Sequence, residues 1–248
     1  MLEGYYLLGI PIDLRSKDLG VIHQITYREF IENNLKLDEL LKPFLMKKEM
    51  LKGENDEFNK FVDSVGNLGV IHLINENSPQ ENIINNLIKT LKLLYKTEDV
   101  CVNPNTKYID INEDITIDID KFDIISTVIL EMFKIEKAEI EDRSQMDEFD
   151  LAFEKKRKEY QKKVNSKQKK IDLNDIVNFI IHTNEFGVDY KKIMGMTIYQ
   201  IKNTYETLMA KQNFETVNEL KLHQFDTSKM RVSDWRNKKI VINSEVDL

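Results

Sequence analysis

The spacing of apolar and polar residues is most regular in the middle of the chain, where the two kinds of residue alternate one by one. Side chains in a β-strand point to opposite faces in turn, so a period of two predicts strands with one buried face. We therefore expect a hairpin near residues 108–119 that turns between Asn112 and Asp114. The apolar positions of this alternation are Ile109, Ile111, Ile115, Ile117 and Ile119.

Elsewhere the apolar residues recur every three to four positions, which is typical of helices with one buried face. Thr26 and Glu29 have the spacing of a capping box, and Thr197 can cap a long final helix. Two segments differ from this pattern. Pro11 favours an extended N-terminal piece over residues 5–12, and the β-branched residues 70–74 favour a short strand. The helical stripes cover residues 26–33, 38–45, 58–65, 79–95, 120–133, 172–181, 188–195 and 197–220.

These elements predict an α+β fold that is predominantly helical, with one β-hairpin or small antiparallel sheet and a C-terminal helical lobe. Residues 136–150 carry seven acidic and two basic residues, whereas residues 155–170 carry nine basic residues and one acidic residue. Adjacent blocks of opposite charge with few apolar residues indicate a hinge or an exposed helical arm. We therefore expect an α+β domain over 1–135, a charged hinge over 136–171 and a helical lobe over 172–248.

Charge and cysteine content narrow the classes of function. The formal net charge is −7, so bulk electrostatics do not favour nucleic acid or an anionic membrane as a partner. A single cysteine, Cys101, excludes an intramolecular disulfide and a four-thiolate zinc site. The start of the chain lacks a signal-peptide pattern, and no apolar run is long enough to span a bilayer. We expect a cytoplasmic protein.

No catalytic or cofactor-binding pattern stands out, so we expect no enzyme and no cofactor. The sequence from Asp110 to Lys121 opens like a calcium loop but has Ile115 and Lys121 where the loop needs Gly and Glu. Asp118 and Asp120 would lie on one strand face and could hold a nuclease's magnesium ion, but a solvated sheet face is the favoured interpretation. Cys101 lies between two valines, which favours a small buried residue over a nucleophile. The four histidines are scattered as His23, His72, His182 and His223.

The basic block could neutralise phosphates along a helix. Tyr160 is the only aromatic residue within it, so base stacking is not indicated. The alternative is a solvated helix, or a helix paired with the preceding acidic block. The candidate nucleic-acid contacts are Lys155, Lys156, Arg157, Lys162 and Lys163.

The C-terminal helices offer the best candidate for a surface that binds a protein partner. Their methionine and tyrosine side chains could receive an apolar helix, because methionine adapts to irregular surfaces. The competing interpretation is that these side chains form the core of the helical lobe. The candidate contacts are Met194, Met196, Tyr199, Tyr205 and Met209.

The layout of the C-terminal part resembles small helical proteins from tail modules of Gram-positive bacteriophages and prophages, particularly tail-assembly chaperones. Residues 172–210 read DLNDIVNFIIHTNEFGVDYKKIMGMTIYQIKNTYETLMA, preceded by the charged segment MDEFDLAFEKKRKEYQKK and followed by SDWRNKKI. The resemblance implies a non-enzymatic assembly protein that holds a helix-rich partner, such as a tape-measure protein, in the host cytoplasm. A virion structural or adaptor protein is the closest alternative, followed by a nucleic-acid-binding regulator.

Overall fold

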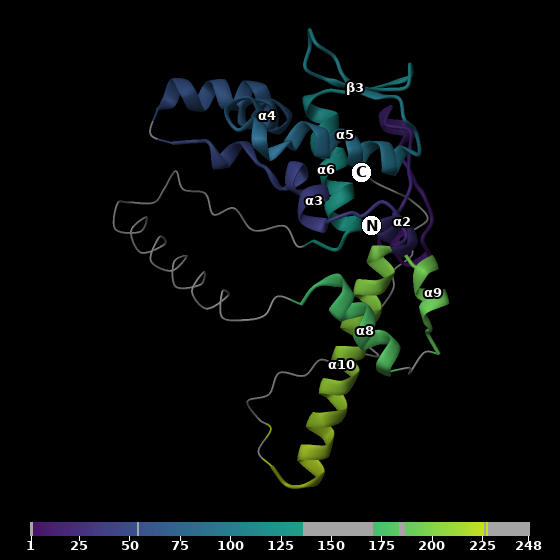
Figure 1. Cartoon of the computed structure of the whole chain (residues 1–248). Helices are drawn as coiled ribbons and strands as arrows, with labels where there is room; N and C mark the ends of the chain where they lie inside the picture. The colour runs from purple at the N-terminus through teal and green to yellow at the C-terminus, as the bar shows by residue number, and fades with distance from the viewer. Residues whose placement is uncertain (1, 54, 136–170, 184–186, 226, 228–248) are drawn as a thin grey trace.

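A computed structural model describes residues 2–53, 55–135, 171–183, 187–225 and 227 (Figure 1). Within these residues the protein is predominantly helical with two small antiparallel sheets, which confirms the expected α+β class. A continuous core of buried apolar side chains runs from Leu2 to Leu208 and joins the N-terminal part to the C-terminal helices. Whether residues 1–135 and 172–248 fold independently stays a prediction.

The N-terminal segment is a helix, so the extended conformation expected for residues 5–12 is wrong. Helix α1 (Glu3–Leu8) ends at Gly9, which adopts φ 68° and donates its backbone N–H to Tyr5 and Tyr6. Because the helix stops before Pro11, the proline ring does not interfere with it. After Pro11, β1 (Ile12–Asp13) pairs with β2 (Val21–Ile22) around the 3₁₀ turn η1 (Arg15–Lys17).

Helix α2 (Tyr27–Glu32) begins with the capping box expected from the sequence: the Thr26 side chain accepts from the Glu29 amide, and Glu29 accepts from the Thr26 amide. The next elements are α3 (Leu37–Leu45), which contains Pro43, the turn η2 (Lys48–Met50) and the long helix α4 (Asp56–Asn77). The turn η3 (Pro79–Glu81) and helix α5 (Ile83–Tyr95) follow.

Helix α4 corrects one expectation and contains a kink. Residues 70–74 are helical, and the predicted strand there is wrong, because Val70 and Ile71 lie fully buried on one face of α4. Gly66 has a non-helical conformation, with φ 61° and ψ −170°, and kinks the helix. The β-branched residues therefore serve packing here, since tertiary contacts outweigh their modest preference for strands.

The hairpin is confirmed as β4 (Ile109–Ile111) and β5 (Ile115–Ile117), and β3 (Val100–Val102) extends it to a three-stranded antiparallel sheet. The alternation ends earlier than expected. Ile119 is the first residue of helix α6 (Ile119–Met132), with Asp118 as its N-cap. Ile109, Ile111 and Ile117 are fully buried beneath the sheet, as their positions in the alternation require.

The C-terminal helices are α8 (Leu173–Thr183), α9 (Tyr190–Gly195) and α10 (Ile198–Leu222). The inner end of α10 packs against α1, where the rings of Tyr6 and Tyr199 lie 5.3 Å apart. The outer part of α10 projects away from the sheet and from α3 to α6 (Figure 1). This arrangement leaves the outer part of α10 open to contact with another molecule.

Candidate partner-binding surface

Helix α10 is fixed at its inner end by a second capping box. The Thr197 hydroxyl accepts from the Gln200 amide at 3.2 Å, and the Gln200 side-chain oxygen accepts from the Thr197 amide at 2.8 Å. The side-chain amide of Gln200 also donates to the Leu7 carbonyl at 2.8 Å. The sequence predicted the cap at Thr197, and the contact with α1 gives it a tertiary role.

Two lysines connect α10 to the end of α6. Lys134 donates to Asn203 at 2.9 Å and to Glu206 at 2.5 Å, and its ammonium lies 5.4 Å from the centre of the Tyr199 ring. Lys202 donates to the Phe133 carbonyl at 2.8 Å, at the C-terminal end of α6, where the helix dipole favours a positive charge. Burial lowers the pKa of Lys202 despite the nearby Glu206 carboxylate. The inner half of α10 is therefore rigidly held.

The predicted partner contacts lie mostly within the folded lobe. Tyr199 is buried against Tyr6, and the ring of Tyr205 meets the ring of Phe179 edge to face. Met194 and Met196 are half-buried against the core, and Met209 is 41 % exposed. Of these five residues only Met209 presents an exposed side chain, and their role in partner binding stays a prediction. The competing interpretation, a helical-lobe core, fits the burial of the others.

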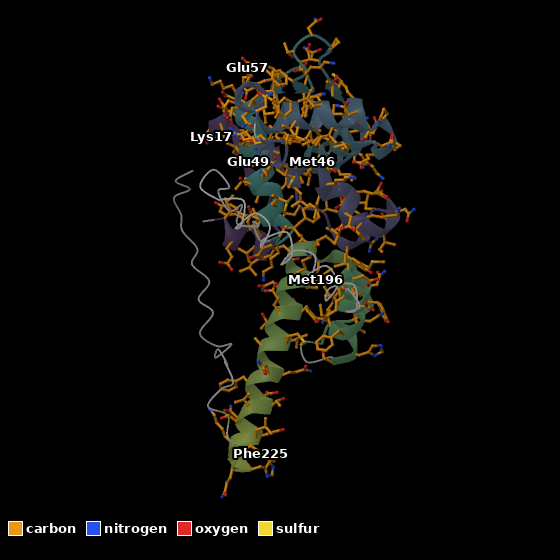
Figure 2. All side chains as sticks on the ribbon, turned by 90° about the vertical axis from the view of Figure 1, so that its left-hand side faces the viewer. Lys17, Met46, Glu49, Glu57, Met196 and Phe225 are labelled. Atoms are coloured by element: carbon orange, nitrogen blue, oxygen red, sulfur yellow. The ribbon has the colours of Figure 1, made fainter. Side chains whose placement is uncertain are left out.

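The outer end of α10 carries apolar side chains that sequence reasoning missed. Leu222 is 82 % exposed and Phe225 is 63 % exposed. Figure 2 places Met196 at the inner end of α10 and Phe225 at its far end. Phe225 is held by a backbone hydrogen bond from its amide to the Leu220 carbonyl. The signal in the sequence was that apolar residues recur among polar ones past Val217, the last buried position of the helix, at Leu220, Leu222 and Phe225.

A second exposed apolar pair lies on α4, far from α10 along the chain. Phe58 and Phe61 are each more than two-fifths exposed, and their ring centres are 6.4 Å apart. Both residues lie in the first half of α4, before the kink at Gly66. Because this pair is also apolar and exposed and lies on another helix, it offers a control surface.

The structure places the candidate metal-binding residues at the start of a helix and not on a strand. Asp118 caps α6 by accepting from the Lys121 amide at 2.9 Å, and Asp120 lies in the first turn of that helix. The two carboxylates therefore do not share a strand face, and the expectation that they do is wrong. Among the described residues no group of three or more His, Cys, Asp or Glu side chains is arranged to hold a metal ion.

Cys101 is exposed, which corrects the expectation of a buried thiol. It occupies the middle of β3, where its backbone pairs with Asp110, while its neighbour Val100 points into the core. The valines on both sides suggested burial, but alternation along a strand sends the residue between them to the opposite face.

The basic block with Lys155, Lys156, Arg157, Lys162 and Lys163, and most of the expected hinge, lie outside the described residues. Its proposed nucleic-acid contacts therefore stay predictions. Within the part of the chain that the structure describes, no helix combines the length and the apolar character that crossing a membrane requires.

Comparison with known families identifies one similarity, in the C-terminal part. A family model described as the YomV second domain matches residues 165–239, a range that takes in α8, α9 and α10. No curated protein and no solved structure matches the chain. YomV is a protein of a Bacillus phage or prophage region, so this segment of the chain is similar to part of a phage-associated protein, and the match does not single out a tail module.

Proposed function

We propose that the chain is a non-enzymatic assembly protein of a phage or phage-tail-like particle, in which the C-terminal helices bind a helix-rich protein. The observation that carries this proposal is the projecting outer part of α10. Leu222 and Phe225 are exposed at its end and Met209 near the middle of the helix, all inside the range that matches the phage-associated family. A tail-assembly chaperone for a tape-measure protein is the most specific form of the proposal.

The physical basis is the burial of apolar area. Each large apolar side chain removed from water contributes about 1.5–3 kcal/mol, so a few residues at the end of α10 can anchor a partner helix. The inner half of α10, fixed by Gln200 and Lys134, holds these residues away from the rest of the fold. The net charge of −7 keeps such a protein and its apolar cargo from self-associating.

Co-expression with the tape-measure protein and the other proteins encoded beside this chain tests the proposal. We expect the tape-measure protein to remain soluble and to be retained by the tagged chain. The triple variant Met209→Ser, Leu222→Ser, Phe225→Ser should lose this retention, whereas Phe58→Ser with Phe61→Ser should keep it. No retained partner, or equal losses in the two variants, would contradict the proposal.

Fractionation of assembled particles distinguishes a chaperone from an adaptor. A chaperone acts before assembly is complete and should be found in the host cytoplasm but not in purified particles. Recovery of the chain at a fixed ratio to other virion proteins would assign a structural or adaptor role and would overturn the chaperone form of the proposal.

A further inference from the structure

A cavity of about 500 Å³ lies where α1, α6 and α10 meet. It is near the inner end of α10, whereas the exposed apolar residues Leu222 and Phe225 are at the outer end. Its apolar wall includes Leu2 and Val128, and the ring of Tyr199 forms part of its lining. The cavity is open to solvent and large enough for a small organic group or a side chain.

The aromatic wall of the cavity is rigid. The rings of Tyr6 and Tyr199 are 5.3 Å apart and inclined by 36°, and both side chains are almost fully buried. The Tyr6 hydroxyl lies 3.3 Å from the Glu131 carboxylate and 3.4 Å from the Val128 carbonyl, and it donates toward both. Aromatic faces carry partial negative charge and attract cations.

The charged groups that line the cavity are mostly acidic. Glu3, Glu131 and Glu206 contribute carboxylates, and Lys134 contributes the one ammonium group among the described lining residues. Their field is felt at Tyr199, whose pKa rises to about 12, first because it is buried and then because Glu3, Glu206 and Glu131 disfavour a phenolate. The lining residues therefore carry a net negative formal charge.

The protein already binds one ammonium group here. Lys134 lies 5.4 Å from the Tyr199 ring centre and donates hydrogen bonds to Glu206 and Asn203. The Glu206 carboxylate therefore balances the charge of the Lys134 ammonium group. Glu131 interacts with a tyrosine hydroxyl instead, and Glu3 makes the same kind of bond to Tyr199. A carboxylate offers about four lone-pair positions, so both acids retain capacity for a cationic donor.

A metal ion does not suit this arrangement. No group of three or more acidic, histidine or cysteine side chains in the described part of the chain can close around one ion. The carboxylates instead surround a cavity with apolar and aromatic walls. That combination suits a cation with an aliphatic stem, which buries its carbons while its charged head reaches the acids.

We propose that the cavity between α1, α6 and α10 binds an alkylammonium or guanidinium group, with the aromatic wall of Tyr6 and Tyr199 facing its stem and Glu3 and Glu131 accepting hydrogen bonds from its head. The group can come from a free polyamine or from a lysine or arginine side chain of a protein. This proposal is independent of the one for the outer end of α10, because the two use different residues.

Titration of the isotope-labelled full chain, followed by its amide NMR signals at low ionic strength, tests the charge requirement. We expect n-butylammonium to shift the amides of Tyr6, Glu131 and Tyr199, while butyrate, with a similar stem and an opposite charge, leaves them unchanged. Equal shifts with both probes, or shifts confined to other parts of the chain, would overturn the proposal.

Three variants test the direction as well as the magnitude of the change in n-butylammonium affinity. Glu131→Gln should weaken n-butylammonium binding about three- to fivefold, because it removes one partly exposed ionic contact. Lys134→Met should strengthen binding by about threefold, because it removes the competing cation. Glu113→Gln, an equal change of charge in the exposed turn between β4 and β5, should have no effect. Unchanged binding in Glu131→Gln, or weaker binding in Lys134→Met, would contradict the assignment.

The source of the cation is resolved with two further probes, spermidine and the blocked peptide acetyl-Ala-Lys-Ala-amide. Tighter binding of spermidine assigns the cavity to a free polyamine, and tighter binding of the peptide assigns it to a basic side chain. Binding of both probes that is no stronger than that of butyrate would overturn the proposal.

Discussion

Thr26 and Thr197 form an isolated antiparallel bridge, and each of them is also the N-cap of a helix with a complete capping box. The backbone amide of Tyr27 donates to Met196 at 2.8 Å, and the amide of Ile198 donates to Ile25 at 3.3 Å. Helices α2 and α10 therefore begin at the same point. This junction connects residues 25–27 to the start of the last C-terminal helix.

Loss of the second cap should be measurable. Thr197→Ala removes the hydroxyl that accepts from the Gln200 amide, so we expect the free energy of unfolding to fall by about 1 kcal/mol. Urea denaturation followed by circular dichroism measures the change. Thr207→Ala is the matched control, because its hydroxyl only donates to the Asn203 carbonyl within the same helix. Equal effects of the two substitutions would contradict the role given to the cap.

Gly66 should tolerate no side chain. A Cβ atom there would lie 2.3 Å from the Cγ2 atom of Ile119, and the backbone has φ +61°, which side chains of L-residues disfavour. Gly66→Ala should lower the free energy of unfolding by at least about 1–2 kcal/mol. Gly195→Ala, at a position where no atom lies within 4 Å of the added Cβ, should change it little. Similar melting temperatures for the two variants would argue against the kink.

His72 should make the fold less stable in acid. Burial lowers its pKa below the ordinary 6.5, with its Nε2 atom 2.8 Å from the Lys107 carbonyl, to which the neutral ring donates. Because the unfolded chain takes up a proton on His72 more readily than the folded chain does, the free energy of unfolding should decrease as pH falls below 6.5.

Urea unfolding at a series of pH values checks this expectation. His72→Gln should flatten the decrease, whereas His223→Gln, at an exposed position after α10, should leave it unchanged. A decrease that is the same in all three proteins would assign the acid sensitivity to other groups.

Cys101 should react in the native protein. Its side chain is exposed on β3, an edge strand of the three-stranded sheet, so a thiol reagent should modify it without denaturant. Cys101→Ser should change the free energy of unfolding by no more than about 0.5 kcal/mol, as expected for a surface substitution. A thiol that reacts only after urea is added would show that the strand face is covered.

Local signals were read correctly from the sequence. The capping box at Thr26, the cap at Thr197 and the alternation of Ile109 to Ile117 involve residues a few positions apart, and all three are present in the structure. Each depends on hydrogen bonds or side-chain directions that the backbone of one segment sets by itself. The alternation was followed one step too far, because Asp118 favours a helix start, which is also a local signal.

The features that the local sequence pattern did not predict depend on contacts between segments that are distant in the sequence. Residues 70–74 are helical because Val70 and Ile71 are buried on one face of α4, and the period of the sequence alone does not fix that choice. Tyr199 is buried because α1 packs against it through Tyr6. The same packing forms the acidic and aromatic cavity, since its side chains come from three helices that the sequence separates widely. Periodicity determines which face of a helix is apolar, but only the tertiary structure determines what covers that face.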